Sequence, residues 1–233
     1  MTPDFFSGLN GPVDFLIVRH GESEGNSAKI LQGRFEYPLS ETGRLQSEDR
    51  GRALKAILVP PNKTILFSSP QERARETAEI IAKETALPCP VYLYELMEMS
   101  LGVWTGKTWD EVKNDDPALW AAFMAKSWDA IPEAEPSSAL YDRALRLWAA
   151  FRDAAIANNA ERIIVVTHGG LIQWLLKSTL HNRAWFPLFP ISNCGLFKLC
   201  VQPRPNEKSA YLCWEEINSP IPNRSAEPRG FPS

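Results

Sequence analysis

Two histidines of this chain end apolar segments and are each followed directly by glycine. His20 follows Val13–Arg19, and His168 follows Arg162–Thr167. A neutral imidazole can act as a nucleophile, or as a hydrogen-bond donor through its protonated ring nitrogen. The third histidine, His181, has no such setting, so we expect it to be a surface or helix-terminal residue.

Charged side chains occupy comparable places along the chain. Arg19 precedes His20, Arg73 follows a second apolar segment, and Glu98 follows a third. Two guanidinium groups and two imidazoles are donors that suit phosphate oxygens. There is no GxxxxGKS or GxxxxGKT motif and no paired acidic cluster for two metal ions. We therefore expect a phosphate site without metal or other cofactor, in which a side chain does the chemistry.

Strands and helices must alternate to position these residues. Branched and aromatic content predicts six strands: Val13–Arg19, Thr64–Ser68, Pro90–Tyr94, Arg162–Thr167, Gly195–Val201 and Ala210–Glu215. Apolar spacing predicts four helices between them, at Glu41–Val59, Pro70–Thr85, Tyr141–Ala157 and Gly170–Leu180. Before the second helix we expect Ser69 as the N-cap, with Glu72 completing a capping box.

This element order predicts the fold class. The first four strands alternate with helices, which favours a mainly parallel sheet covered on both faces. The last two follow each other through a short polar loop, which favours an antiparallel hairpin. We predict an α/β three-layer αβα sandwich with a mainly parallel six-stranded sheet and an antiparallel C-terminal strand pairing.

Such a sheet would bring the polar residues to one crevice. Ligands of open α/β sheets bind outside the carboxyl ends of the strands. His20, Arg73, Glu98 and His168 each follow a different predicted strand. Helix N-termini at this edge would add backbone N–H groups that favour an anion.

Several motifs, in sequence order, resemble the histidine phosphatase superfamily. They are Arg19-His20-Gly21-Glu22-Ser23 with Asn26, Gln32–Ser40, Ser68–Ala78, Leu96-Met97-Glu98 with Gly102, Trp104 and Gly106, and Val166–Gly170. A later segment, Ser192-Asn193-Cys194-Gly195, resembles a loop of the same family. The resemblance extends roughly from Val13 to Val201.

The resemblance implies a metal-independent mechanism through phosphohistidine. His20 would attack the phosphorus, while Arg19, Arg73 and His168 would bind the phosphoryl oxygens. Glu98 would protonate the leaving alcohol and then accept a proton from the attacking water. Further substrate-binding residues implied by the motifs are Asn26, Ser23, Gly33, Arg34 and Gly169.

Some assignments remain open at this stage. Glu95 competes with Glu98 as proton donor, although Glu98 has the family's spacing to Gly102. Arg34 and Glu36 either contact substrate or pair with each other. An aromatic stripe is either a lid over the crevice or ordinary core packing; its members are Trp104, Trp109, Trp120, Trp128, Phe123 and Met124.

The leading functional hypothesis is a phosphomonoester hydrolase acting on a small phosphorylated substrate. No arginine occurs between Lys126 and Tyr141, where the resemblance implies an arginine-rich insertion for mutases. A cofactor-dependent phosphoglycerate mutase stays open as one alternative, and a non-catalytic phosphate-binding regulatory module as another.

Composition sets the broad class of protein. The 233 residues, 44% of them hydrophobic, suit a single domain, placed at residues 1–217 before a flexible Pro-rich tail at 218–233. The net charge of −3 argues against nucleic-acid binding, and the short apolar runs argue against a membrane span. Four scattered cysteines and no visible secretory signal predict a cytoplasmic protein. A homodimer stays open, because a lid and a dimer face look alike in sequence.

Overall fold

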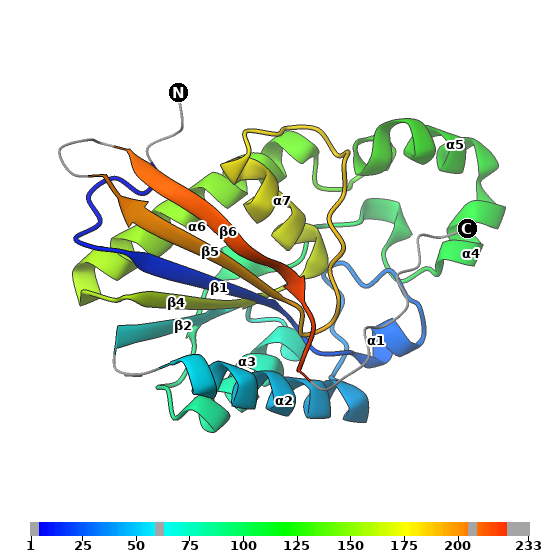
Figure 1. The fold of residues 1–233 in the computed structure, drawn as a ribbon. Helices are drawn as coiled ribbons and strands as arrows, with labels where there is room; N and C mark the ends of the chain where they lie inside the picture. The colour runs from blue at the N-terminus through cyan, green and yellow to red at the C-terminus, as the bar shows by residue number, and fades with distance from the viewer. Residues whose placement is uncertain (1–4, 59–62, 205–208, 223–233) are drawn as a thin grey trace.

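The computed structural model describes residues 5–58, 63–204 and 209–222. Its six strands form one sheet in the order β3-β2-β4-β1-β5-β6 (Figure 1). Their bounds are β1 Val13–Arg19, β2 Thr64–Ser68, β3 Val91–Tyr92, β4 Arg162–Thr167, β5 Leu196–Pro203 and β6 Ala210–Ser219. Strands β3, β2, β4 and β1 are mutually parallel, whereas β5 runs antiparallel to both β1 and β6. The predicted fold class and the antiparallel C-terminal pairing are confirmed.

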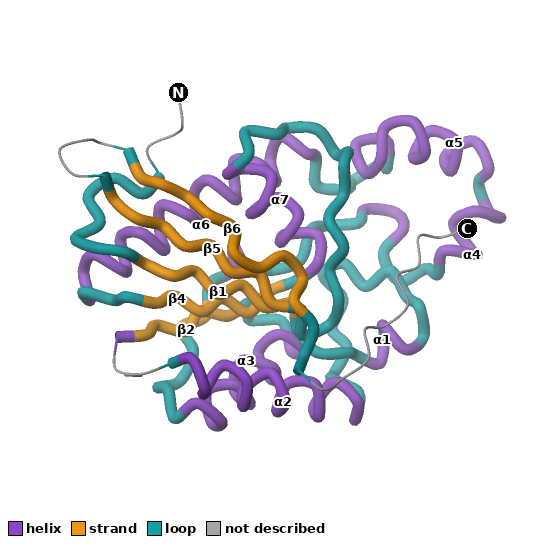
Figure 2. The backbone as a smooth tube through the Cα atoms, in the orientation of Figure 1, coloured by secondary structure: helices purple, strands orange, loops and turns teal. Residues whose placement is uncertain are grey.

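Helices cover both faces of the sheet (Figure 1). The long helices are α2 Glu41–Ile57, α3 Glu72–Thr85, α6 Ser137–Asn158 and α7 Gly169–Thr179. Helices α2 and α3 pack on one face, and α6 and α7 pack on the other. Three shorter helices, α1 Glu24–Ser27, α4 Trp109–Asp115 and α5 Pro117–Lys126, lie past the strand ends at one side of the molecule (Figure 2).

The central strand β1 shows why the sheet is buried on both sides. Phe15 and Ile17 belong to the core beneath α6 and α7, whereas Leu16 and Val18 belong to the core beneath α2 and α3. Successive side chains of a strand point to opposite faces, so a strand covered twice is apolar along its length.

The start of α3 differs from the predicted cap. The helix begins at Glu72 with Gln71 as N-cap, so the expected cap at Ser69 was wrong. The Glu72 N–H donates instead to the carboxylate of Glu36 at 2.8 Å. The Ser69 hydroxyl accepts from the Gln71 N–H at 3.3 Å and also lies 2.8 Å from His168 Nε2, so it has a tertiary partner besides the local one.

Several boundaries also differ. Strand β3 has only two residues, and α2 ends at Ile57, while Val59 lies outside the described residues. Strand β6 includes Asn218, which the sequence placed at the start of a flexible tail. Its Oδ1 accepts from the Ser192 N–H at 2.7 Å, so this residue is held in place. Residues 223–233 of that tail lie outside the described part of the chain. No helix among the described residues is long and apolar enough to cross a membrane.

Truncation of a core leucine tests this account of the packing. Leu147 of α6 is fully buried, so we expect Leu147→Ala to lower the free energy of unfolding by about 2–5 kcal/mol. The matched variant Leu45→Ala on α2, where the leucine is 46% exposed, should change it by less than about 0.5 kcal/mol. Urea denaturation measures both, and equal losses would contradict the described core.

Candidate active site

The predicted crevice residues do meet at the carboxyl ends of the strands. Strands β1 and β4 are neighbours in register, and each is followed directly by a histidine. The ring centroids of His20 and His168 are 5.1 Å apart. Arg73 reaches this pair from the first turn of α3, and Glu98 approaches the N-terminus of α7.

The ring of His20 is held in one tautomer. Its Nδ1 lies 2.6 Å from the carbonyl oxygen of Gly21. A carbonyl can only accept, so Nδ1 carries the proton and Nε2 keeps its lone pair. Burial, reinforced by the charges of Arg73 and Arg19, lowers the pKa of His20 well below 6.5. The imidazole is therefore neutral at physiological pH, with Nε2 available for attack on an electrophile.

His168 is also buried, and it offers a different ring nitrogen to the site. Its Nε2 lies 2.8 Å from the hydroxyl of Ser69, which itself accepts from the Gln71 N–H at 3.3 Å. Within the described ranges, His168 Nδ1 has no hydrogen-bond partner. When Ser69 donates to Nε2, the ring proton lies on Nδ1, where it can be donated to a ligand. Burial lowers the pKa of His168 well below 6.5, with Arg73 the next largest cause.

Arg73 places a buried positive charge beside His20. Its Nε–H points at His20 Nε2 across 3.3 Å, and its terminal nitrogens donate to the carbonyls of Gly33 and Phe35, both at 2.9 Å. Burial lowers the pKa of Arg73 to about 10, so the guanidinium stays charged at neutral pH. In the described part of the chain, no carboxylate lies within ion-pair distance of it. The charge is thus available to an anion that binds over His20.

Arg19 and the backbone of His20 are held by a loop before β5. The Arg19 guanidinium donates to the carbonyl of Ile191 at 2.8 Å. The Asn193 side chain donates to the His20 carbonyl at 3.1 Å, and the Cys194 N–H donates to the Arg19 carbonyl at 3.1 Å. The sequence motif included this loop but did not indicate its positioning task.

Asn26 lies beside the same loop. Its Oδ1 accepts from the Ser23 N–H at 3.1 Å and from the Asn193 amide at 3.3 Å. Ser23 is fully buried as the N-cap of α1, and its hydroxyl contacts Asn26 and Gln32. The geometry thus shows Ser23 supporting Asn26, and substrate contact by either residue stays a prediction.

The carboxylate of Glu98 accepts hydrogen bonds from backbone N–H groups. One oxygen accepts from the Met99 N–H at 2.9 Å, and the other accepts from the Gly170 N–H at 3.1 Å. A Cβ atom on Gly170 would lie 2.5 Å from Glu98 Oε1, so glycine is required for this approach. The Glu98 N–H donates to Gln71 at 2.7 Å, a contact that no local sequence pattern signals.

Other candidates lie elsewhere. The carboxylate of Glu95, the rival proton donor, pairs with exposed Arg146 at 2.8 Å. Arg34 pairs with Glu135 at 3.1 Å rather than with Glu36, so the pairing interpretation was wrong. Contact of Arg34 or Glu36 with substrate stays a prediction.

His181 and the aromatic residues around Trp104 have the structural places that the simpler interpretations predicted, at the surface and in the core. His181 is exposed after α7, as expected of a residue without a catalytic task. Trp104 is 2% exposed in the core. Its ring lies 5.0–6.5 Å, centroid to centroid, from the rings of Trp109, Trp120, Phe123 and Trp128. These aromatic residues pack together against the core, while Met124 is exposed.

The chain is similar in sequence to known proteins. The family model described as histidine phosphatase superfamily (branch 1) matches residues 15–211. A metal-independent phosphoserine phosphatase of Arabidopsis thaliana is 32% identical over 166 residues, which are 69% of this chain and 66% of the relative. A probable phosphoglycerate mutase GpmB of Photorhabdus laumondii is 30% identical over 200 residues, covering 84% of this chain and 88% of the relative. The chain spans only 41% of a probable 2-carboxy-D-arabinitol-1-phosphatase of Arabidopsis thaliana, so some relatives are much longer.

Solved structures share the fold. Mycobacterial hydrolase 1 is similar with a TM-score of 0.75 at 23% identity, over 89% of this chain and 99% of that one. A mycobacterial glucosyl-3-phosphoglycerate phosphatase is similar with a TM-score of 0.74 at 23% identity, over the same shares of the two chains.

The buried histidines predict how stability depends on pH. Their pKa values are lowered from 6.5 in the folded state, so below pH 6.5 the unfolded chain binds more protons than the folded chain. The free energy of unfolding should therefore fall as pH drops from 7 to 5.5. Each histidine contributes a slope that approaches about 1.4 kcal/mol per pH unit.

Urea denaturation across this pH range measures the slope. Combining His20→Gln with His168→Gln should remove the two contributions, and each single variant should remove one. An unchanged slope in the double variant would show that the folded state does not hold these imidazoles neutral.

Proposed function

The chain belongs to the histidine phosphatase superfamily, and from this membership we propose that it hydrolyses small phosphomonoesters through a phosphohistidine intermediate on His20. The observation that carries the proposal is the state of His20. Its Nδ1 proton is committed to the Gly21 carbonyl, and its unprotonated Nε2 faces the Arg73 guanidinium. A neutral nucleophile beside a cation that has no direct ion pair among the described residues suits attack on a phosphate dianion.

The first half-reaction forms the phosphoenzyme. His20 Nε2 attacks the phosphorus in line with the ester oxygen, so the N–P bond forms as the P–O bond breaks. Protonated Glu98 gives its proton to the departing oxygen, and the alcohol leaves neutral. The Gly21 carbonyl accepts from Nδ1–H and so supports the positive charge that the ring gains.

The second half-reaction returns the enzyme to its starting state. A water molecule attacks the phosphorus, and the N–P bond breaks with its electron pair returning to Nε2. The Glu98 carboxylate takes the proton of that water, so phosphate leaves and Glu98 is protonated again. One carboxyl group thus serves as acid and then as base, and the proton balance closes without a metal or cofactor.

The surrounding donors would stabilise the charge that spreads over the equatorial oxygens. Arg73, Arg19 and the Nδ1–H of His168 are the groups we propose for this task, with the Asn26 amide as a neutral donor. Removal of one such donor commonly lowers kcat by about 10²–10³-fold.

Relatives support a small phosphorylated alcohol as the substrate class. Their names include a phosphoserine phosphatase, a 2-carboxy-D-arabinitol-1-phosphatase and a mannitol-1-phosphatase. These names share a phosphomonoester and differ in the alcohol.

Rapid quenching in alkaline detergent, after mixing with a radiolabelled phosphomonoester, tests the mechanism. We expect label that is stable in alkali and labile in acid, as a phosphorus–nitrogen bond requires. His20→Ala should carry no label and lose activity by at least about 10³-fold. His181→Ala, at the exposed histidine, is the matched control and should retain both label and activity.

Other outcomes separate the alternatives. Turnover that persists in His20→Ala would refute attack by this histidine. Wild-type protein that binds phosphorylated ligands but turns over none of a broad panel would indicate the regulatory module. EDTA should leave the rate unchanged, and restoration by a divalent metal after EDTA would refute a metal-independent reaction.

The phosphoglycerate mutase alternative has a specific observation in its favour, the 30% identity to a probable GpmB mutase. Incubation with 3-phosphoglycerate distinguishes the two reactions. Hydrolysis predicts free phosphate and glycerate, because water reaches the phosphoenzyme. Formation of 2-phosphoglycerate without free phosphate would instead establish the mutase.

A further inference from the structure

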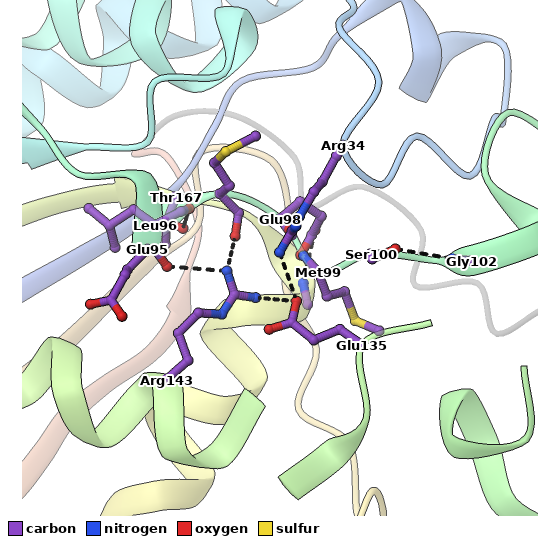
Figure 3. Close-up of polar contacts among 12 residues, drawn as sticks. Arg34, Glu95, Leu96, Glu98, Met99, Ser100, Gly102, Glu135, Arg143 and Thr167 are labelled. Atoms are coloured by element: carbon purple, nitrogen blue, oxygen red, sulfur yellow. Dashed lines mark hydrogen bonds and ion pairs between the residues drawn. The ribbon is translucent and has the colours of Figure 1, made fainter. Parts of the chain in front are cut away.

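The segment that leads to Glu98 is held by side chains of other elements (Figure 3). It follows the two-residue strand β3 and contains a single 3-10 turn, Tyr94–Leu96. The carbonyls of residues 95 to 98 all accept hydrogen bonds from side chains that lie far away in sequence. A segment with so little backbone pairing depends on these donors for its conformation.

Arg143 of α6 supplies two of the four bonds. One terminal nitrogen donates to the Met97 carbonyl at 2.7 Å and to the Glu95 carbonyl at 3.2 Å. The residue is 5% exposed, so its guanidinium is committed to the interior rather than to solvent. The Thr167 hydroxyl, directly before His168, adds a bond to the Leu96 carbonyl at 2.7 Å.

Glu135 joins Arg143 to a second arginine. Its Oε2 accepts from Arg143 at 3.0 Å and from Arg34 at 3.1 Å. The Nε–H of Arg34 donates in turn to the carbonyl of Glu98 itself, at 3.2 Å. Figure 3 shows this carboxylate between the two guanidinium groups. One partly exposed acid therefore connects donors that hold the carbonyls before and after the Glu98 Cα.

We propose that Arg143 and Glu135 are positioning residues for the general acid, and that they set where the Glu98 carboxyl meets the leaving oxygen. The inference rests on the role proposed for Glu98 above. Neither residue needs to touch the substrate, because both act through the backbone that carries Glu98. A displacement of about 1 Å in a catalytic group can cost about 10²-fold in rate.

Dependence on the leaving group tests the proposal. The kcat/KM value reports steps up to release of the alcohol, which include proton donation by Glu98. An alkyl phosphate needs that proton, whereas p-nitrophenolate leaves without one. A misplaced acid therefore slows the alkyl substrate selectively, and a general loss of structure slows both substrates alike.

Arg143→Lys keeps the positive charge but removes the planar guanidinium that binds the Glu95 and Met97 carbonyls and the Glu135 carboxylate together. We expect it to lower kcat/KM by about 10–10²-fold for an alkyl phosphate and by less than about 3-fold for p-nitrophenyl phosphate. Glu135→Gln, at a partly exposed site, should show the same selectivity with a smaller loss. It tests the proposal independently if Arg143→Lys does not fold.

The matched control is Arg146→Met. Arg146 lies on the same helix and contacts the Glu95 carboxylate at the surface instead of the backbone. It should leave kcat/KM unchanged for both substrates. Equal losses on the two substrates, or no loss, in Arg143→Lys and Glu135→Gln would overturn the positioning role.

Glu98→Gln separates this failure from failure of the proposed acid. It should show the same selectivity as Arg143→Lys with a larger loss on the alkyl substrate. If Glu98→Gln slows both substrates equally, the assignment of Glu98 as acid is wrong. If only Glu98→Gln is selective, Glu98 keeps its role and the positioning inference fails.

Discussion

The site depends on burying the guanidinium of Arg73 beside a neutral imidazole. Removal of a charge from water is costly, and the usual remedy is a carboxylate partner. Here the compensation comes from the carbonyls of Gly33 and Phe35 and from His20 Nε2. These groups accept hydrogen bonds without carrying an opposite charge, so Arg73 still acts on His20 as a positive charge. Burial, reinforced by this positive charge, lowers the pKa of His20 and keeps the ring neutral, as the nucleophile role proposed for it requires.

The sheet topology brings a second histidine beside His20. Strands β1 and β4 are adjacent and parallel, with Arg19 paired to Thr167, so the histidines that follow leave the sheet side by side. The His20 N–H donates to the Thr167 carbonyl at 2.9 Å, which extends the pairing by one residue. Two ring nitrogens, for which we propose different tasks, are thereby brought to one site from two distant parts of the chain.

The sequence predicted those residues of the site that stand in a recognisable local pattern, such as a strand end or a short motif. Apolar strands ending in histidine, and the order of the motifs, located His20, His168, Arg73 and Glu98. The predicted cap of α3 was wrong because the helix begins later, at Glu72, and the additional contact of Ser69 with His168 is one that local spacing cannot reveal. The partner of Arg34 could not be predicted either, because Glu135 lies far from it in sequence.

Longer-range supports were hidden from the sequence altogether. Gln71 binds both the Glu98 N–H and the Gly33 carbonyl, and therefore links the acid to the loop around Arg73. A glutamine near a helix start carries no signal for such a link. Asn218 likewise looked like part of a polar tail, yet it fixes the loop before β5 through Ser192.

Three buried arginines of this fold bind the backbone in the same way but have different additional partners. Each donates to two backbone carbonyls: Arg50 to those of Cys194 and Ser219, Arg73 to those of Gly33 and Phe35, and Arg143 to those of Glu95 and Met97. Carbonyl binding is therefore a structural device that the fold uses repeatedly, and it does not by itself mark a functional arginine. Arg73 differs in its Nε–H, which points at His20 Nε2, whereas Arg143 directs its second terminal nitrogen to a carboxylate. The additional partner therefore separates an arginine that supports the backbone from one that also lies beside a candidate catalytic histidine.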